Sequence, residues 1–331
     1  MNTRLEYVQN NEEVIIVSDN TLHSAYLPEA RAHLIFDLVS GKLSPAPIWK
    51  KKEYRLKFLL RTALFYRPTK MMLASLSRRA DFEQLLSAQV TLPSKPHRQY
   101  LSLGLSAAQR AEAIVGHYQF IDALNSPSLA QALCAPHETP LLTLTGKDDS
   151  RFTVYASCAG KAEREGESTL WLYDDAHTLL ASATFSVVNT PTGRELTIGG
   201  LQGPRRSVSH EVIKLATRNC YGLFPKRILL ECFGLLATHG NISSLSGVSD
   251  NGHVFRALRY RLSKGKHFHA SYDEFWSSVD GVKQNHWRWQ LPVRQPRKAL
   301  EEIASKKRAE YRRRFALLDE MEAQFAQLMS R

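Results

Sequence analysis

Apolar residues at helical spacing dominate residues 26–135 of the chain. Between residues 49 and 66 an apolar residue recurs every three or four positions, which predicts an amphipathic helix. The apolar stripe of this helix consists of Leu56, Leu59, Leu60, Ala63 and Leu64. Another helix is predicted to begin at Ser106, because Gln109 completes a capping box ahead of an apolar face. This region is therefore expected to be mostly helical.

After Pro136 and Pro140 the pattern changes to that of short strands. Polar or glycine-containing turns separate five apolar segments, which is typical of an antiparallel meander. The predicted strands are residues 141–145, 152–156, 169–173, 179–188 and 195–201. The last strand contains Gly199 and Gly200, which indicate a β-bulge or the close approach of a ligand to the backbone.

A further helix is predicted to follow this meander. Ser207 is its expected N-cap, Gly222 its expected C′ residue, and Pro225 prevents its continuation. Beyond it we predict a buried strand, an irregular stretch and a last strand, at residues 226–233, 234–280 and 287–293.

A single long helix is predicted from Lys298 to the end of the chain. Apolar residues between Tyr311 and Leu328 recur at the spacing of a coiled-coil seam, which suits either a second chain or the chain's own domain. The fold class is therefore α+β, with a helical N-terminal region, a mixed and mostly antiparallel sheet with helices, and a long C-terminal helix. The expected boundaries are residues 1–137, 138–293 and 294–331.

The composition is that of a folded chain. With 331 residues, 43% of them hydrophobic and 23% charged, it can bury a large core. Residues 1–20 lack the basic start and apolar run of a secretory signal, and no segment has the roughly 20 apolar residues that span a bilayer. We expect a soluble, cytoplasmic protein that can also lie at the inner face of a membrane.

The cysteines and histidines give no sign of a metal site. The cysteines are Cys134, Cys158, Cys220 and Cys232, and none forms a CxxC pair or lies near a histidine at zinc-ligand spacing. We expect reduced thiols and no bound metal.

A large positive charge limits the choice of partners. The chain has 44 Lys and Arg against 32 Asp and Glu, a net charge of +12. Such a field attracts nucleic acid, anionic lipid, phosphorylated ligands or an acidic carrier protein. The net charge alone does not distinguish among these partners. The oligomeric state is left open.

The loop of residues 199–207 is the strongest candidate for a functional site. Gly203 and Pro204 turn the chain from a strand into a helix, whose free N–H groups and dipole favour an anion. Arg205 and Arg206 add two cations that suit a phosphate group. A plain strand-to-helix turn with solvated arginines is the alternative interpretation.

A second candidate surface is the basic helix of residues 50–70. It carries eight Lys or Arg residues and one acid, Glu53, among leucines and aromatic residues. This pattern suits a helix that lies on anionic lipid, and it equally suits a core helix with a solvated basic side, which we favour.

From about Trp49 to Val282 the chain resembles the VirK/YbjX family of bacterial proteins. The resemblance rests on the segments KKKEYRLKFLLRTALF, KPHRQYLSLGLS, GLQGPR, GLFPKRILL and GVSDNGHVF. It implies a role in virulence, in maintenance of the cell envelope and in resistance to cationic antimicrobial peptides. No biochemical activity comes with it.

Residues 152–255 also resemble GNAT-type acyltransferases in the order of their strands and helices. In that fold a bulged strand holds a thioester and a glycine-containing loop holds the pyrophosphate of coenzyme A. Here Gln202 and Gly203 match this loop, but the spacing departs from its pattern. The resemblance therefore implies an acyl donor that is either coenzyme A or acyl carrier protein, held by Gly200, Leu201, Gln202, Gly203, Arg205, Arg206 and Ser207.

The same resemblance implies the catalytic residues. Backbone N–H groups of residues 200–202 would hold the oxyanion, Glu231 or His239 would act as the base, and Tyr260 as the acid. Each of these residues also has an ordinary structural interpretation, since no spacing rule identifies them.

Three hypotheses follow from the sequence. The first is an acyltransferase-like enzyme that acts on a cell-envelope component with a thioester donor. The second is a non-catalytic adaptor that docks on an anionic membrane or a partner protein through its basic helices. The third, nucleic-acid binding by Trp276, Trp287 and Trp289, ranks last because these residues belong to no known module.

Overall fold

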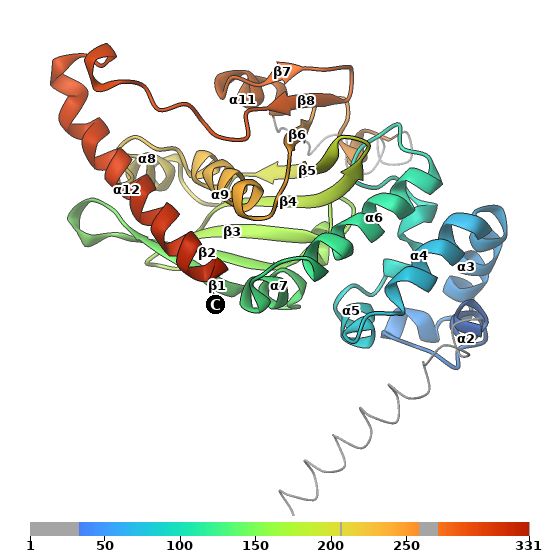
Figure 1. The fold of residues 1–331 in the computed structure, drawn as a ribbon. Helices are drawn as coiled ribbons and strands as arrows, with labels where there is room; N and C mark the ends of the chain where they lie inside the picture. The colour runs from blue at the N-terminus through green and yellow to red at the C-terminus, as the bar shows by residue number, and fades with distance from the viewer. Residues whose placement is uncertain (1–32, 206, 258–270, 331) are drawn as a thin grey trace, which may run out of the picture. The chain divides into compact units, whose positions relative to one another are not determined.

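The computed structural model describes residues 33–205, 207–257 and 271–330 (Figure 1). The chain forms two compact units, residues 1–94 and residues 95–331. The 3-10 helix η3 (Leu92–His97) contains the point at which one unit ends and the next begins. The domain boundaries expected from the sequence stay a prediction.

The described part of the first unit is helical, as expected. Its helices are α2 (Leu34–Ser40), η2 (Pro47–Lys50), α3 (Lys52–Leu64), α4 (Tyr66–Leu76) and α5 (Phe82–Ala88). The fully buried indole of Trp49 lies at the centre of this unit. Its Nε1 donates a hydrogen bond to the carbonyl of Val90 at 2.7 Å, and its ring packs edge-on against Tyr54 and Phe58.

Helix α3 faces the opposite way from the prediction. The leucine stripe points outward, with Leu56, Leu60 and Leu64 exposed by 56%, 63% and 75%. The buried side instead contains Phe58 and Thr62, which are four positions apart. Because Phe58 is the residue that packs on Trp49, the aromatic side of the helix turns inward and the leucines remain uncovered.

The second unit is built on one mixed sheet. Among the described residues this sheet has eight strands in the order β1-β2-β3-β4-β5-β6-β8-β7. Every pair is antiparallel except β5 and β6, which run parallel. The strands are β1 (Thr139–Thr145), β2 (Arg151–Cys158), β3 (Ser168–Asp174), β4 (Leu179–Thr190), β5 (Gly193–Gln202), β6 (Ser244–Val248), β7 (Val282–Lys283) and β8 (Arg288–Leu291). The predicted α+β class and the predicted meander are confirmed.

Helices surround this sheet in the second unit. The α-helices are α6 (Ala107–Asp122), α7 (Pro127–Cys134), α8 (His210–Asn219), α9 (Pro225–His239), α11 (Tyr272–Ser278) and α12 (Ser305–Met329). Short 3-10 helices are η4 (Lys147–Asp149), η5 (Gly160–Ala162), η6 (Val254–Arg256) and η8 (Leu300–Glu302). The predicted capping box is confirmed, since Ser106 and Gln109 bond reciprocally at the start of α6.

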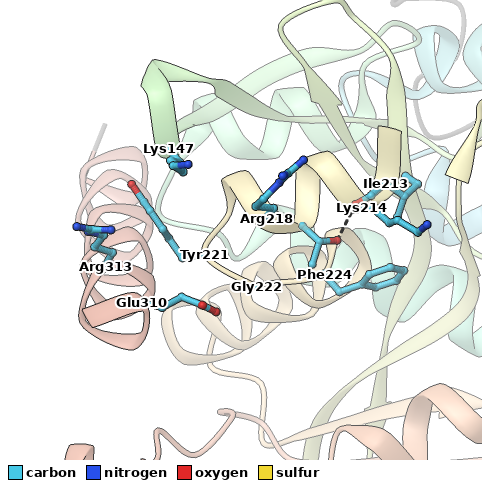
Figure 2. A pocket seen from close by; sticks show the side chains of 10 residues that line it. Lys147, Ile213, Lys214, Arg218, Tyr221, Gly222, Phe224, Glu310 and Arg313 are labelled. Carbon is cyan, nitrogen blue, oxygen red and sulfur yellow. Dashed lines mark hydrogen bonds between the residues drawn. The ribbon is translucent and has the colours of Figure 1, made fainter. Parts of the chain in front are cut away.

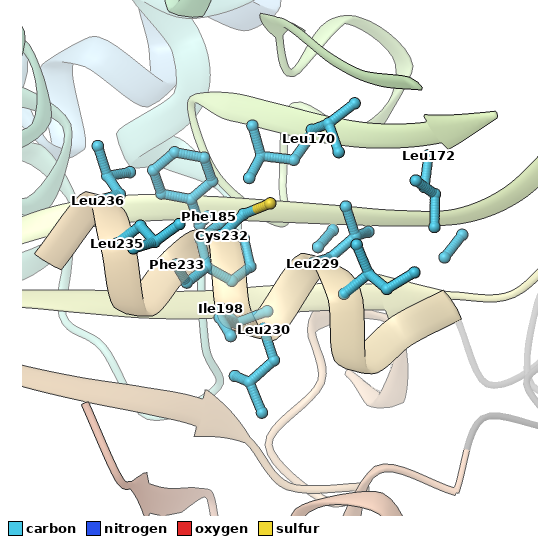
Figure 3. Packing of buried hydrophobic residues seen from close by; sticks show 14 of the residues in the cluster. Leu170, Leu172, Phe185, Ile198, Leu229, Leu230, Cys232, Phe233, Leu235 and Leu236 are labelled. Atoms are coloured by element: carbon cyan, nitrogen blue, oxygen red, sulfur yellow. The ribbon is translucent and has the colours of Figure 1, made fainter. Parts of the chain in front are cut away.

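One face of the sheet is apolar and carries the main core. Because side chains alternate along a strand, Leu170 and Leu172 of β3 share a face with Phe185 of β4 and Ile198 of β5. Helix α9 lies across this face, and its Phe233 meets Phe185 at a ring-centroid distance of 5.0 Å (Figure 3).

The opposite face of the sheet is polar and aromatic. Thr169 and Thr184 form a cross-strand hydrogen bond of 2.9 Å. Tyr155, Trp171, Ser182 and Gln202 are successive cross-strand partners on β2, β3, β4 and β5. We call these four residues the aromatic row.

The segment after α8 differs from the prediction. The run 226–233, predicted as a strand, belongs to α9, which begins with Pro225 at its first position and extends to His239. A short apolar run does not distinguish a buried strand from a buried helix, and proline suits the first turn of a helix. The parallel strand is β6 (Ser244–Val248), which lies inside the segment predicted as irregular.

The C-terminal helix packs on its own chain. Helix α12 begins at Ser305, after the short η8, and buries Leu317, Leu318, Met321 and Phe325 against β1 and α9. Gln324 also bonds both backbone groups of Thr143, since its Nε2 donates to the carbonyl at 2.7 Å and its Oε1 accepts the N–H at 3.0 Å. The side chain thereby covers part of the edge strand β1.

The contact between α9 and the sheet generates a stability prediction. Phe233→Ala removes a fully buried ring that lies against Phe185. We expect the free energy of unfolding to fall by about 3–5 kcal/mol, because the helix and the sheet cannot close the cavity. Urea denaturation measures this, and Phe255→Ala, at a half-buried position, should cost less. An equal loss for both variants would contradict the packing described.

Candidate functional site

A bulge interrupts β5 where the sequence places its two glycines. Ile198 pairs with Phe185 and Gly200 pairs with Thr184, so Gly199 has no residue opposite it on β4. The parallel pairing with β6 ends at the same point, with Ile198 opposite Gly247. Strand β5 continues to Gln202 without β6 beside it. The predicted bulge is confirmed.

The close approach to these glycines is made by the chain itself. A Cβ atom on Gly199 would overlap the backbone carbonyl of Glu165, and a Cβ atom on Gly200 would overlap the Glu165 carboxylate. Neither glycine can be replaced without moving Glu165. The sequence predicted either a bulge or a ligand at this place, and the bulge with Glu165 accounts for both glycines.

The Glu165 carboxylate is buried and hydrogen-bonded. Its side chain is 2% exposed, and His253 Nε2 lies 3.2 Å from Oε1 with 1% of its own side chain exposed. Gln202 Nε2 lies 3.4 Å from both carboxylate oxygens. Because His253 Nδ1 accepts the backbone N–H of Phe255 at 3.3 Å, the proton of a neutral ring is on Nε2, which donates to Glu165.

Tyr272 lies beside the open edge of β5. Its hydroxyl accepts the backbone N–H of Leu201 at 3.2 Å, and its ring stacks on that of His253 at 5.5 Å. Burial raises the pKa of Tyr272 well above its ordinary value, the negative charge of Glu165 raises it further, and the Leu201 N–H opposes both effects. Tyr272 is therefore a neutral hydroxyl at physiological pH.

We refer to Glu165, Leu201, Gln202, His253 and Tyr272 as the β5 site. It brings together a carboxylate, a backbone N–H on the edge of β5 that β6 does not cover, and a tyrosine hydroxyl. These are the groups that a reaction needs to remove a proton, to hold a developing oxyanion and to protonate a leaving group. The carboxylate, the imidazole and the phenol are buried, whereas Gln202 is exposed.

Arg205 approaches the polar face next to this site. Burial raises the pKa of Tyr173, a hydrogen bond to Glu138 adds to this, and the positive charge of Arg205 opposes it. Arg205 is therefore close enough to Tyr173 of β3 for their charges to interact. The aromatic row ends at Gln202, so it leads along the same face to Glu165.

The predicted donor-binding residues lie on two different elements. Gly200, Leu201 and Gln202 belong to β5, whereas Gly203, Arg205 and Ser207 lie in the loop that leads to α8. The N-cap of α8 is Ser209 rather than Ser207, so the helix begins two positions later than predicted. Arg206 lies outside the described residues. The role of these residues in binding a donor stays a prediction.

Two of the predicted catalytic residues, Glu231 and His239, are not part of the β5 site. Glu231 lies on α9, not on a strand, where burial raises its pKa and arginines such as Arg294 oppose the rise. His239 is the last residue of α9, and its ring packs against Phe325 of α12 at 5.7 Å. Tyr260 lies outside the described residues. Their catalytic role stays a prediction, while Glu165, His253 and Tyr272 are the residues that the structure adds.

The predicted C-terminal end of α8 is off by one position, because Tyr221 rather than Gly222 is the C′ residue. Tyr221 adopts the left-handed conformation expected of Gly222, with φ of 53°, and Gly222 follows it with φ of 78°. The N–H of Gly222 bonds to the carbonyl of Thr217 at 2.8 Å, as in a Schellman motif.

In the described part of the chain, no group of three or more His, Cys, Asp or Glu side chains is placed to hold a metal ion. Within those same residues no helix combines the length and the apolar character needed to cross a membrane.

The fold and the site define an α+β protein with one parallel strand pair that stops at a bulge. Residues 47–327 match the model of the family described as "Protein of unknown function (DUF535)". The chain belongs to this family, and the resemblance to VirK/YbjX is confirmed.

Three relatives support this membership. The chain is 36% identical to the uncharacterized protein YbjX of Escherichia coli (strain K12) over 294 residues, which cover 88% of each chain. It is 30% and 26% identical to two uncharacterized proteins of Haemophilus influenzae (strain ATCC 51907 / DSM 11121 / KW20 / Rd), each over 223 residues. These alignments cover 67% of this chain and 72% and 70% of the two relatives. No solved structure matches the chain.

The geometry around Glu165 generates a second prediction. Gly200→Ala places a methyl group on the buried carboxylate and should lower the free energy of unfolding by about 1–3 kcal/mol. Gly203→Ala is the matched control, because its Cβ would meet only the end of Lys226 at 3.9 Å. Thermal unfolding of both variants tests this. Equal unfolding temperatures would show that Glu165 does not lie on Gly200.

Proposed function

We propose that the protein transfers an acyl group from a thioester donor to a nucleophile, and that the β5 site carries out this reaction. One observation carries the proposal. The parallel pair of β5 and β6 stops at the Gly199 bulge, and the Tyr272 hydroxyl accepts the Leu201 N–H where β6 no longer covers β5. Glu165 lies against Gly199 and Gly200, directly before Leu201. A thioester that entered beside β5 would lie against all three groups.

Each group has a defined task in this reaction. The Glu165 carboxylate takes a proton from the nucleophile as its nitrogen or oxygen bonds to the carbonyl carbon. The Leu201 N–H holds the oxyanion. The C–S bond then breaks, the leaving thiolate takes the proton of Tyr272, and Glu165 returns its proton to the phenolate. His253 and Gln202 hold the carboxylate in place through their hydrogen bonds.

Tyr272 must move during this cycle. Its hydroxyl occupies the Leu201 N–H, so the donor carbonyl has to displace it. The displaced hydroxyl would remain beside the departing sulfur, because its ring is held against His253. The buried site is therefore the closed form, and donor binding opens it.

The surroundings support an anionic donor and an envelope acceptor. Gly203 and Arg205 follow β5 directly and are not buried, which suits the phosphate of a pantetheine arm. The net charge of +12 complements an acidic acyl carrier protein as well as coenzyme A. The half-buried Tyr155 and Trp171 of the aromatic row offer an apolar surface to the acceptor. A component of the bacterial cell envelope is the acceptor that the family resemblance favours.

A thiol-release assay tests the enzyme. Acyl-coenzyme A and acyl carrier protein of matched chain length are each mixed with an amine acceptor, and free thiol is measured. We expect Glu165→Gln and Tyr272→Phe to reduce turnover about 10²–10⁴-fold, because each removes a proton-transfer group. Donor affinity, measured by calorimetry, should change little in Glu165→Gln.

Glu163→Gln is the control for this experiment. It changes a carboxylate in the same segment that lies at 3.3 Å from Arg98 and is not part of the β5 site. Its turnover should equal that of the unaltered protein. If the unaltered protein binds neither donor, or if all three variants turn over equally, the proposed reaction is wrong.

A second function is favoured by the exposed stripe on α3. Leu56, Leu60 and Leu64 are uncovered on a helix whose Lys52 and Lys57 are also exposed. An apolar stripe flanked by cations is typical of a helix that lies in the surface of an anionic bilayer. Docking of the first unit on such a membrane would bring an enzyme of the cell envelope to its acceptor. Arg55 is not among the cations that would contact the lipid, because its guanidinium donates to the carbonyl of Ser40 at 2.6 Å.

Liposome co-sedimentation tests this docking. Binding should rise with the fraction of phosphatidylglycerol, and Leu60→Gln and Leu64→Gln should each weaken it about tenfold through lost apolar burial. Charge reversal at Lys52 and Lys57 should remove the dependence on anionic lipid. Leu215→Gln, at an exposed leucine of α8, is the control. Binding that ignores lipid charge, or that Leu215→Gln weakens equally, would exclude α3 as the docking surface.

The described tryptophans count against the nucleic-acid hypothesis. Trp276 is fully buried, and its Nε1 donates to the carbonyl of Val248 at 2.8 Å. Trp289 Nε1 donates to Asp273 at 3.0 Å. Of the three candidates, only Trp287 presents much of its ring for stacking.

A further inference from the structure

A basic pocket lies away from the β5 site, between α8, the turn that joins β1 to β2, and α12 (Figure 2). Its volume is about 670 Å³, which is in the range of pockets that bind small molecules. The lining residues are Lys147, Ile213, Lys214, Thr217, Arg218, Tyr221, Gly222, Phe224, Glu310 and Arg313. None of them belongs to the β5 site.

Four cations from three separate elements line this pocket, namely Lys147, Lys214, Arg218 and Arg313. Glu310 is the single acid in the lining, and its carboxylate lies 3.4 Å from the guanidinium of Arg314 outside it. Within the part of the chain that is described, Arg218 and Arg313 form no ion pair with an acid. Two guanidinium groups without an acidic partner in one pocket favour an anion that accepts several hydrogen bonds.

The wall of the pocket is apolar and aromatic. Ile213, Tyr221 and Phe224 contribute it, and Phe224 is 41% exposed although it is a large aromatic residue. Figure 2 shows the ring of Tyr221 extending between Lys147 and Arg313. The ligand should therefore combine an anionic group with an apolar or flat part.

The backbone of Tyr221 is held in a defined conformation beside the pocket. Its φ of 53° is in the left-handed region, which favours glycine and is rare for a bulky aromatic residue. The Arg314 guanidinium donates to its carbonyl at 2.8 Å and helps to hold this conformation. The Schellman motif at the end of α8 requires this conformation, and it fixes the position of the Tyr221 ring in the wall of the pocket.

We propose that this pocket binds a phosphate-bearing small molecule whose remaining part is aromatic or aliphatic. Arg218 and Arg313, which lie on either side of Tyr221, supply guanidinium groups to the phosphate oxygens, and Tyr221 and Phe224 cover the apolar part. Lys214 is paired with Glu211 at 2.7 Å and Lys147 with Asp148 at 3.6 Å, so these two lysines add less positive charge. A nucleotide and a phospholipid headgroup with short chains share this chemistry. The inference goes beyond the proposed acyl transfer, because it requires neither the β5 site nor a thioester.

Calorimetry with four soluble probes tests the pocket. ADP and dihexanoyl phosphatidic acid, the latter below its critical micelle concentration, represent the two sources of the phosphate. Adenosine and dihexanoylglycerol are the same molecules without it. We expect one phosphate probe to bind and its phosphate-free counterpart to bind at least tenfold more weakly, since charge-assisted hydrogen bonds are lost. The preferred probe identifies the source.

Variants separate this pocket from general attraction to a basic protein. Arg218→Gln with Arg313→Gln should weaken the preferred probe about tenfold or more, whereas Arg312→Gln with Lys306→Gln, two exposed cations of α12 outside the lining, should not. Tyr221→Gly should also weaken binding, without lowering the unfolding temperature by more than a few degrees. No binding of either phosphate probe, or an equal loss in the control variant, would overturn the proposal.

Discussion

The burial of one carboxylate determines the centre of this fold. An ionised carboxylate is costly to remove from water unless hydrogen bonds replace the lost solvation. Glu165 receives them from His253 and Gln202, and it can lie against β5 only because residues 199 and 200 have no side chain. The glycines, the bulge and the carboxylate therefore form one unit. A change in any of them affects the other two.

The consequences of this unit extend along the sheet. Because Gly199 is unpaired, the register of β5 shifts and its parallel pairing with β6 ends, which leaves room for Tyr272 at Leu201. The segment before the carboxylate is anchored by a hydrogen bond from Leu101 N–H to the Arg164 carbonyl at 2.7 Å. The catalytic groups that we propose are thus placed by backbone constraints rather than by flexible surface side chains.

A second buried carboxylate strengthens this region. Glu167 lies two residues beyond Glu165, pairs with Lys95 at 2.7 Å and accepts the hydroxyl of Tyr118 at 2.8 Å. Burial raises the pKa of Tyr118, and the charge of Glu167 raises it further. Satisfied networks of this kind keep a core in one arrangement, which a preorganised site requires. Hydrogen bonds therefore hold the polar face of the sheet in one arrangement, as packing does for its apolar face.

Much of the fold could be predicted from local patterns, and most of the site could not. Strands β1 to β5 follow from alternation and turn residues, and α6 from its capping box, because these signals are local. The prediction of a strand at residues 226–233 was wrong because a short apolar segment suits both a helix and a strand. The leucines of α3 were assigned to the core because nothing in their spacing shows that Trp49 selects the aromatic side. The glycine pair indicated a close approach, but its partner Glu165 lies in another segment with no local signal.

A crystal structure with a ketone analogue of an acyl thioester shows most directly whether acyl transfer takes place at the β5 site. We expect the ketone oxygen to accept the N–H of Leu201 in place of the Tyr272 hydroxyl. We also expect the carbonyl carbon to lie within reach of Glu165 and the pantetheine arm to extend toward Gly203 and Arg205. An analogue bound elsewhere, with the hydrogen bond between Leu201 and Tyr272 intact, would contradict the assignment of the β5 site as the place of acyl transfer.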